Sequence, residues 1–376
     1  MATIKGIAPI QGQNTAFFDA LGTTAPTFGT GATCRPGGGD TCLISSGVSA
    51  TSWAQRNLPS GNRVLAHSFA FYVDTNPNSG TSAIMLVTNA SAVTMGLQWN
   101  RSSTKLGAFI STSGNTLSTN TMNTGEWYWI DTLLDVSTGT ASLRWWIDGI
   151  EQTAVTFSLT AADLSSIQWG WHATTASSYT FRIMDAVWSY TSADAPLGQY
   201  VVTAAPLTGC GTHSLGSGAF KKTGAVAISG GETTSYTEIN EVPPNTSTWI
   251  EQTVIDATHY CEYVSSCSTA PDAVTVLAQY QGSATGAYTF ELRLFDTVES
   301  SDALSGLTKS GTTVRYGVKD LGNTRPGDGA SWTTALSRPR FGYSSDVTPN
   351  PQLTQTMFIV ANKQAVTSSA SAAGVI

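Results

Sequence analysis

Carboxylates close to aromatic side chains are the first residues that could do chemistry. Retaining glycoside hydrolases need two carboxyl groups about 5 Å apart. Glu126 and Asp131 differ by five positions, so on a regular strand they point to opposite faces. Asp135 shares a face with Asp131 but falls at a predicted turn, and Glu238 and Glu241 flank another turn. None of these three carboxylate pairs has the arrangement that hydrolysis needs, and we predict that the chain is not an enzyme.

A second candidate for chemistry is the segment GTHSLGSG, which contains His213, Ser214 and Ser217. A hydrolase nucleophile of this kind stands in a Gly-x-Ser-x-Gly turn between a strand and a helix. That pattern is absent from the segment, which is rich in small residues. The segment therefore predicts a flexible or packed surface loop, and no catalytic residue is assigned.

Aromatic side chains are the third candidate, because an exposed ring can stack on a sugar or bury itself in a protein interface. Four residues could be displayed in this way on the expected strands: Tyr128, Trp146, Trp169 and Trp171. Indole rings in a β-sandwich more often belong to the core. Both interpretations stay open from the sequence.

Metal and cofactor sites have little support. The histidines and cysteines do not form the close pairs that a zinc site needs. A calcium ion could be held by carboxylates near strand ends. Five residues are placed there: Asp74, Asp131, Asp135, Asp148 and Asp185. Because they do not form a dense acidic loop, we expect no cofactor and leave calcium open.

The five cysteines allow two short-range disulfides. Cys34 and Cys42 could close one loop, and Cys261 and Cys267 another, in an oxidising setting. The alternative is that all of them are free, partly buried thiols.

Composition and charge exclude two classes of partner. Only 11% of residues are charged, against roughly 25% in an average soluble domain. The net charge is −7, and the basic residues form no cluster, so we expect no nucleic-acid binding. No segment approaches the ~18 apolar residues of a membrane span, and the N-terminus lacks the pattern of a secretory signal. We expect synthesis in the cytoplasm and no membrane insertion.

The elements that must position these residues are β-strands, since apolar residues alternate along most of the chain. Segments 93–100 and 105–112 alternate around a polar turn and predict a hairpin. Segments 127–135 and 141–148 predict a second hairpin, and Asp148-Gly149 predicts a tight turn into a further strand. The default assignment puts five side chains into the core between two sheets: Trp127, Trp129, Leu143, Trp145 and Ile147. Aromatic residues occupy both parities, which requires either that both sheet faces are covered or that one aromatic row is exposed.

The order of these segments predicts an all-β protein with two domains. A jelly-roll sandwich is followed by a second, smaller β-sandwich or barrel-like domain. We predict these divisions: an N-terminal segment 1–30, the jelly roll 31–190, a connector 191–200, the second domain 201–363 and a flexible tail 364–376.

The stretch 125–149 has the order Trp-bearing strand, Asp at the strand end, Ser-Thr-Gly-Thr turn, strand, Asp-Gly. This order resembles laminin-G-like, concanavalin-type jelly rolls, and the resemblance covers about residues 30–190. It implies two antiparallel sheets packed face to face.

Several segments of the second half resemble, in order, a β domain of tailed-bacteriophage structural proteins. They are TGCGTHSLGSGAFKKTGAVAI, TEINEVPPNTSTWIEQTVID, TVRYGVKD, TRPGDGASWT and RPRFGYSSDVTPNPQLTQTMFIVA, within about residues 200–362. The resemblance implies a virion component of the minor-tail-protein kind and brings no catalytic residues with it.

We therefore expect a structural protein of a tailed-phage virion that packs against other virion proteins and forms a homo-oligomer. Two alternatives remain open: a capsid decoration protein with the jelly roll outward, and a lectin-like adhesin that binds a host-surface glycan.

Overall fold

A computed structural model describes most of the chain. The described residues are 2–47, 51–75, 81–110, 113–172, 179–215, 219–243, 245–254, 258–296, 299–343 and 350–364. They fold entirely as β-strands, short 3-10 turns and loops, which confirms the all-β prediction. None of their helices is long and apolar enough to cross a bilayer. The predicted tail lies almost wholly outside these residues.

Strands up to Ser189 build a sandwich of two antiparallel sheets. Sheet A contains β1 (Gly6–Ile7), β3 (Thr27–Thr30), β4 (Thr41–Gly47), β6 (Val64–Thr75), β11 (Trp127–Asp135), β12 (Thr140–Ile147), β13 (Ile150–Glu151), β14 (Val155–Ser158) and β16 (Tyr179–Ser189). Its order is β13-β12-β11-β6-β16-β4-β3, with β1 beside β16 and β14 beside β12.

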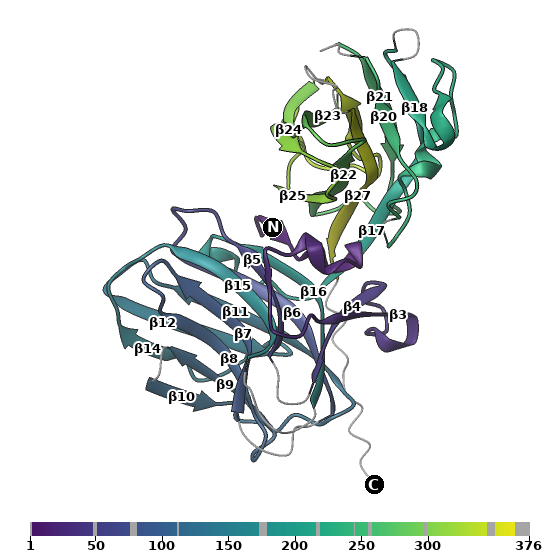
Figure 1. Cartoon of the computed structure of the whole chain (residues 1–376). Coiled ribbons are helices and arrows are strands. Elements are labelled where there is room, and N and C mark those ends of the chain that lie inside the picture. Colours follow the sequence, from purple (N-terminus) through teal and green to yellow (C-terminus); the bar gives the residue numbers. More distant parts are fainter. Residues whose placement is uncertain are drawn as a thin grey trace.

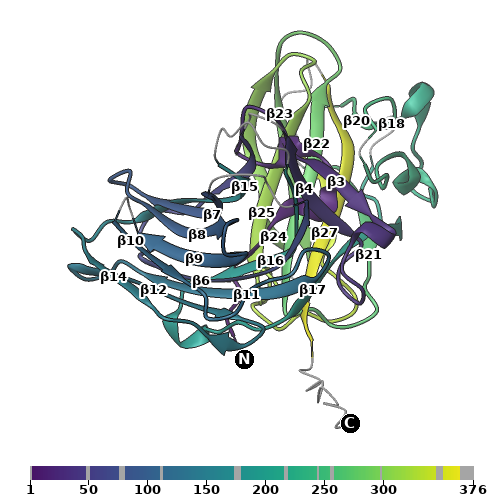
Figure 2. The ribbon, with the colours of Figure 1, turned by 90° about the horizontal axis from the view of Figure 1, so that it is seen from below.

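Sheet B covers one face of sheet A. It contains β2 (Ala20–Leu21), β5 (Ser52–Asn57), β7 (Thr81–Asn89), β8 (Thr94–Asn100), β9 (Lys105–Ile110), β10 (Ser113–Leu117) and β15 (Leu164–Trp171). Its order is β10-β9-β8-β7-β15-β5-β2, so the predicted hairpin of β8 and β9 is confirmed as part of a longer meander. Figure 2 shows the two sheets as stacked layers.

The predicted turn at Asp148-Gly149 is also present. Asp148 has φ 50° and Gly149 has φ 79°, and Ile147 pairs with Ile150 across the turn. Positive φ at both central residues is the geometry that matches the twist of a two-residue hairpin. The turn therefore joins β12 to β13 as the sequence indicates.

Both faces of sheet A are buried, which explains why both parities carry aromatic residues. Trp145 and Ile130 face sheet B in the sandwich core, whereas Trp129 and Leu133 lie on the outer face, in another apolar cluster. The default assignment of Trp127 and Trp129 to the space between the sheets is therefore wrong. They share a parity with Leu133, and the opposite parity of β11 faces inward.

The second half folds into one strongly bent sheet, sheet C. Its strands are β17 (Tyr200–Cys210), β18 (Phe220–Lys222), β19 (Val226–Ala227), β20 (Ile250–Gln252), β21 (Tyr260–Ser265), β22 (Ala273–Gly282), β23 (Ala287–Phe295), β24 (Glu299–Ser310), β25 (Arg315–Gly322), β26 (Arg338–Gly342) and β27 (Pro351–Lys363). The main path runs β19-β18-β20-β27-β17-β21-β26-β23-β24, and β22 pairs with both β25 and β27. The sheet encloses an apolar core of its own around Tyr263, Phe290 and Phe358.

The N-terminal segment lies between the two halves of the molecule (Figure 1). Strand β1 pairs with β16 of sheet A and also contacts β22, β25 and β27. Short 3-10 turns follow it and recur at other connections: η1 (Pro9–Gly12), η2 (Thr15–Phe17), η3 (Gly31–Thr33), η4 (Ser192–Asp194), η5 (Thr223–Ala225) and η6 (Ser235–Glu238). Residues 1–30 are thus built into both the sandwich and its contact with sheet C.

A third apolar cluster, here called the junction cluster, joins the two halves. Sheet A contributes Trp129, Leu133, Trp146, Met184 and Val187, the N-terminal segment contributes Ile4, Ile7 and Phe17, and sheet C contributes Tyr200, Val202, Leu277, Met357 and Ile359. All of these side chains are buried. A large apolar interface of this kind restricts relative motion of two domains.

Leu277→Ala tests whether this cluster couples the two halves. Leu277 is fully buried in sheet C, so truncation should lower the free energy of unfolding by about 2–5 kcal/mol. Nine of the eleven tryptophans precede residue 190, so tryptophan fluorescence reports mainly the sandwich. We expect the tryptophan fluorescence of the variant to report unfolding at a lower urea concentration than that of the wild type.

The control is Val226→Ala, at a 51% exposed position of the same sheet, which should change the free energy of unfolding by less than about 0.5 kcal/mol. An unchanged tryptophan transition in Leu277→Ala would contradict coupling.

Candidate functional site

Three of the four aromatic residues singled out from the sequence are not displayed. Trp169 and Trp171 are fully buried on the inner face of sheet B, and the Trp169 indole N–H donates to Nε2 of His67 at 3.0 Å. Trp146 is 4% exposed on the outer face of sheet A, beside the Arg144 guanidinium at 5.0 Å. These three rings therefore follow the core interpretation of the two that the sequence left open, because Trp169 and Trp171 face sheet A and Trp146 belongs to the junction cluster.

Tyr128 is the fourth of these residues, and it is half-buried. Its hydroxyl accepts from the Asn123 N–H at 2.7 Å and donates to Glu126 at 2.8 Å. Burial raises the pKa of Tyr128 to about 12. The residue lines a small hollow of about 120 Å³ together with Ile147 and Ile150, at the β12–β13 edge.

Neither of the two disulfides that the sequence allows is formed, and all five cysteines are free thiols. The Cys34 thiol donates to backbone carbonyl oxygens, and burial raises the pKa of Cys42 to about 12. Cys261 is fully buried in the core of the second domain. Cys267 lies beyond the end of β21, where its thiol donates to the Thr269 carbonyl. These thiols serve as packed side chains, as the alternative interpretation expected.

The aspartates considered for calcium are engaged in separate places. Each carboxylate has a different partner. Asp74 pairs with Arg182. The other four accept from backbone N–H groups: Asp131 from Gly198, Asp135 from Ser137, Asp148 from Trp129 and Asp185 from Gly39. The described part of the chain contains no group of three His, Cys, Asp or Glu side chains that could hold a metal ion.

The loop with His213 and Ser214 is part of the second domain's packing. His213 is buried, and its Nδ1 accepts from the Glu262 N–H at 3.0 Å. Ser214 forms a backbone bridge with Tyr260, and Ser217 lies outside the described residues. This arrangement fixes the imidazole as a hydrogen-bond acceptor for the backbone.

Asp185 ties the sandwich to the second domain. It sits at a bulge of β16 with φ 54°, a conformation that Asp tolerates better than most residues. Its carboxylate accepts from the N–H of Gly39 at 3.1 Å and of Val202 at 2.9 Å, and it pairs with Arg35 at 3.2 Å. Burial raises the pKa of Asp185, while Val202 and Arg35 favour its charged form. A Cβ on Gly39 would stand 2.0 Å from the Val202 carbonyl oxygen, so only glycine fits there.

Asp131 holds the connector between the domains. It lies on the outer face of sheet A, 1% exposed, and accepts from the Gly198 N–H at 2.9 Å. Burial raises the pKa of Asp131 to about 6, and its hydrogen bonds only partly offset that rise. The connector is therefore packed onto the sheet, with Leu197 fully buried beside it.

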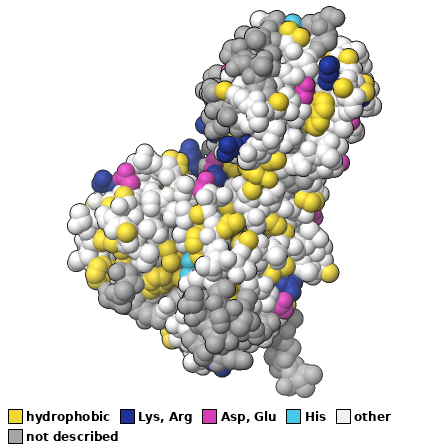
Figure 3. Space-filling model, viewed as in Figure 1, with side chains coloured by type: hydrophobic (Ala, Val, Ile, Leu, Met, Phe, Trp, Pro, Cys, Tyr) yellow, Lys and Arg dark blue, Asp and Glu magenta, His cyan; other side chains and the backbone are white. Residues whose placement is uncertain are grey.

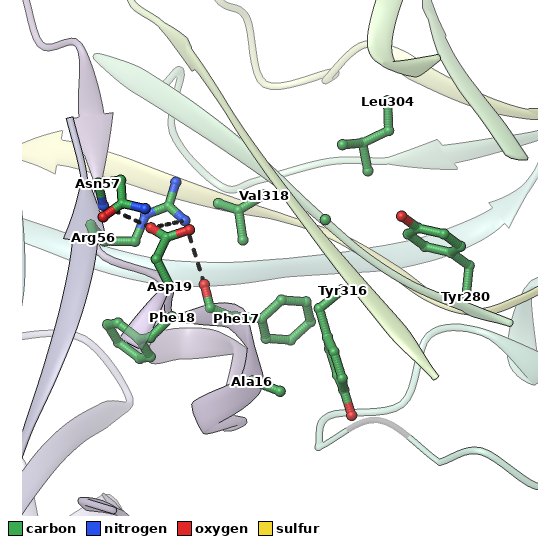
Figure 4. Close-up of a pocket in the computed structure, with 11 residues that line it drawn as sticks. Ala16, Phe17, Phe18, Asp19, Arg56, Asn57, Tyr280, Leu304, Tyr316 and Val318 are labelled. Atoms are coloured by element: carbon green, nitrogen blue, oxygen red, sulfur yellow. Dashed lines mark hydrogen bonds and ion pairs between the residues drawn. The ribbon is translucent and has the colours of Figure 1, made fainter. Parts of the chain in front are cut away.

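A cleft of about 350 Å³ opens at the same junction, on its solvent side. We call it the interdomain cleft. Its lining comes from the N-terminal segment, from β5 and from the second domain: Ala16, Phe17, Phe18, Asp19, Arg56, Asn57, Tyr280, Leu304, Tyr316, Gly317 and Val318. Figure 4 shows the charged residues on one side and the tyrosines on the other.

The polar side of the cleft is held by Arg56. Its guanidinium lies 3.2 Å from Asp19 and 3.8 Å from Asp320. Asp19 also accepts from the Asn57 N–H at 2.7 Å, which fixes the carboxylate at the cleft wall. The Arg56 side chain is only 10% exposed, and its buried Nε has no hydrogen-bond partner in the described structure.

The aromatic side is fixed by ring contacts. The Phe17 and Tyr316 rings meet edge to face at 5.3 Å, which joins the N-terminal segment to β25. The Tyr280 ring stacks on Phe290 at 4.0 Å and is 2% exposed. Its hydroxyl points into the cleft in Figure 4. Polar and apolar groups thus converge at a domain interface, a common location for ligand pockets.

Sequence reasoning missed this cleft. Its residues come from positions 16–19, 56–57, 280, 304 and 316–318, and no motif connects them. Only the fold brings these segments together.

Comparison with known proteins adds fold-level similarity. No protein-family profile matches the chain. No curated protein matches it either. A Trypanosoma rangeli sialidase is similar at 17% identity and a TM-score of 0.29, over 39% of this chain and 25% of that chain. A cellulose-induced protein is similar at 13% identity and a TM-score of 0.37, over 47% of this chain and 90% of that chain. An alginate lyase is similar at 10% identity and a TM-score of 0.31, over 39% of this chain and 74% of that chain.

Two of these three proteins are enzymes by name. The chain covers only 16% of another structure, described as a sialidase. At these TM-scores we take neither substrate nor activity from the comparison.

Asp131→Asn tests the buried carboxylate at the connector. A pKa raised to about 6 in the folded state means that folding favours the protonated acid. This stabilisation is present below about pH 4 and is lost as pH rises through 6. Relative to Asp131→Asn, the wild type should lose about 2 kcal/mol of unfolding free energy between pH 4 and pH 7. Urea titrations at four pH values measure this difference, and a constant difference would show that Asp131 titrates normally.

Proposed function

We propose that this chain is a structural component of a tailed-bacteriophage virion, of the minor-tail-protein kind, that packs against other virion proteins. The ordered resemblance of residues 200–362 to phage structural domains motivates the assignment. The observation that carries it in the structure is the junction cluster, which joins two β domains into one body. Such a body suits a part with a fixed position in a larger assembly.

The proposal gives the chain no catalytic role. Its buried ionisable groups are engaged in holding the fold: Asp185 and Asp131 bind backbone N–H groups, and His67 accepts from an indole. Burial lowers the pKa of His67 to about 3, which keeps its ring neutral under ordinary conditions. These groups contribute to architecture through hydrogen bonds made inside the molecule.

Exposed apolar residues at sheet edges supply the contact surface. Ile150 on β13 and Phe157 on β14 are 57% and 38% exposed, at the edge of sheet A. Val226 on β19 and Val254 beyond β20 are 51% and 40% exposed, in the second domain. Figure 1 places β14 and β18 at opposite ends of the molecule, and Figure 3 shows hydrophobic side chains gathered near β14. Edge strands with apolar side chains favour pairing with a neighbouring chain, either another virion protein or a second copy.

Mass spectrometry and electron microscopy of purified phage particles test the assignment. We expect the chain to co-purify with particles in a fixed ratio, and an antibody against it to label the tail. Label on the capsid surface would favour a decoration protein. Absence of the chain from purified particles would overturn the virion assignment.

Substitution at the sheet edge tests the contact surface. A double variant, Ile150→Lys with Phe157→Lys, should reduce incorporation into particles about tenfold, because interface binding depends on a few buried apolar residues. Thr156→Lys is the matched control, since Thr156 is an exposed residue of the same strand. Both proteins should retain wild-type circular dichroism. Normal incorporation of the double variant would place the contact elsewhere.

A further inference from the structure

We propose that the interdomain cleft binds a neutral saccharide of one or two rings, a binding activity beyond the packing role. The cleft measures about 350 Å³, near the lower end of the ~300–1,000 Å³ typical of ligand pockets. This volume suits a small ligand better than a protein segment.

The chemistry of the lining indicates a polyhydroxylated ligand. Asp19 offers only acceptors, Arg56 offers only donors, and Asn57 and the Tyr280 hydroxyl offer both. A sugar hydroxyl is itself a donor and an acceptor, so the hydroxyls of one sugar can satisfy these groups on both sides of the cleft. The side that carries Tyr280 also presents Leu304 and the Tyr316 ring, which suit the C–H face of a sugar.

The charge of the cleft favours a neutral ligand over an anion. Asp19 and Arg56 are the only charged side chains among the described lining residues, and they lie 3.2 Å apart. Asp320 gives Arg56 a second carboxylate at 3.8 Å. The guanidinium is therefore already compensated, and a carboxylate or phosphate ligand would face Asp19 at close range.

Tyr280 is the buried polar group aimed at the ligand. Its ring is held on Phe290, so the hydroxyl has a fixed position before any ligand arrives. Fixed groups lose little conformational entropy on binding, which strengthens recognition. Because Asp19 and Arg56 belong to the first domain and Tyr280 to the second, the ligand would contact both halves of the molecule.

Ligand-observed NMR with the full-length protein tests the proposal. The probes are the methyl glycosides of glucose, galactose, mannose and N-acetylglucosamine, with sodium glucuronate as the anionic comparison. We expect saturation transfer to at least one neutral glycoside and none to glucuronate. Failure of all four neutral glycosides, or binding of glucuronate alone, would overturn the proposal.

Two conservative variants locate the site. Tyr280→Phe keeps the ring and removes one hydroxyl, and should weaken the bound glycoside about fivefold, the value of one neutral hydrogen bond. Asp19→Asn should weaken it about tenfold. The control is Asp163→Asn, because Asp163 also pairs with an arginine and accepts from a backbone N–H, but outside the cleft. Binding that is unchanged in both cleft variants, with melting temperatures preserved, would place the sugar elsewhere.

This test is independent of the virion assignment. If no glycoside binds but the chain is incorporated into particles normally, only the saccharide proposal for the cleft fails. Absence from particles with intact glycoside binding would instead support a free lectin.

Discussion

Burial of both faces of sheet A is the constraint on which the rest of the structure depends. A sheet whose outer face carries Trp129, Leu133 and Trp146 cannot leave that face in water without exposing a large apolar surface. The N-terminal segment and sheet C cover it, and the two domains thereby become one body. The apolar contact sets the relative position of the two domains. The hydrogen bonds of Asp185 and Asp131 to backbone N–H groups then fix their alignment.

The same contact creates the interdomain cleft. Phe17 belongs to the junction cluster and also meets Tyr316 at the cleft wall. Arg56 reaches from β5 toward Asp320 on the second domain. A shift of one domain against the other would separate these groups, so the proposed ligand site depends on the interface. The edge strands proposed to contact other virion proteins lie away from it, which leaves packing and ligand binding able to operate independently.

Much of the fold could be predicted from the sequence, because strand periodicity and turn chemistry are local. The alternation in 93–100 and the Asp148-Gly149 turn each determine a hairpin through interactions between near neighbours. The assignment of faces could not be predicted in the same way. Trp127 and Trp129 have the residue type of the inter-sheet core, yet they lie on the outer face of sheet A, toward sheet C. Local sequence does not reveal this, because that face is buried by a domain more than sixty residues further along the chain.

The candidate site was even less accessible to sequence reasoning. Asp19, Arg56 and Tyr280 have ordinary local surroundings, and their convergence is a property of the tertiary contact alone. Conversely, Trp169 and Trp171 form a regular pair on one strand that resembles a sugar platform, but sheet A covers it. Spacing along a strand gives the face that a side chain shares with its neighbours, and it does not tell whether another sheet lies over that face.

The most direct test of a single two-domain body is ¹⁵N relaxation of the full-length protein in solution. If the apolar interface holds the domains together, backbone amides of the sandwich and of sheet C should report one common rotational correlation time, appropriate to the whole chain. Two distinct and shorter correlation times, one for each domain, would contradict the account.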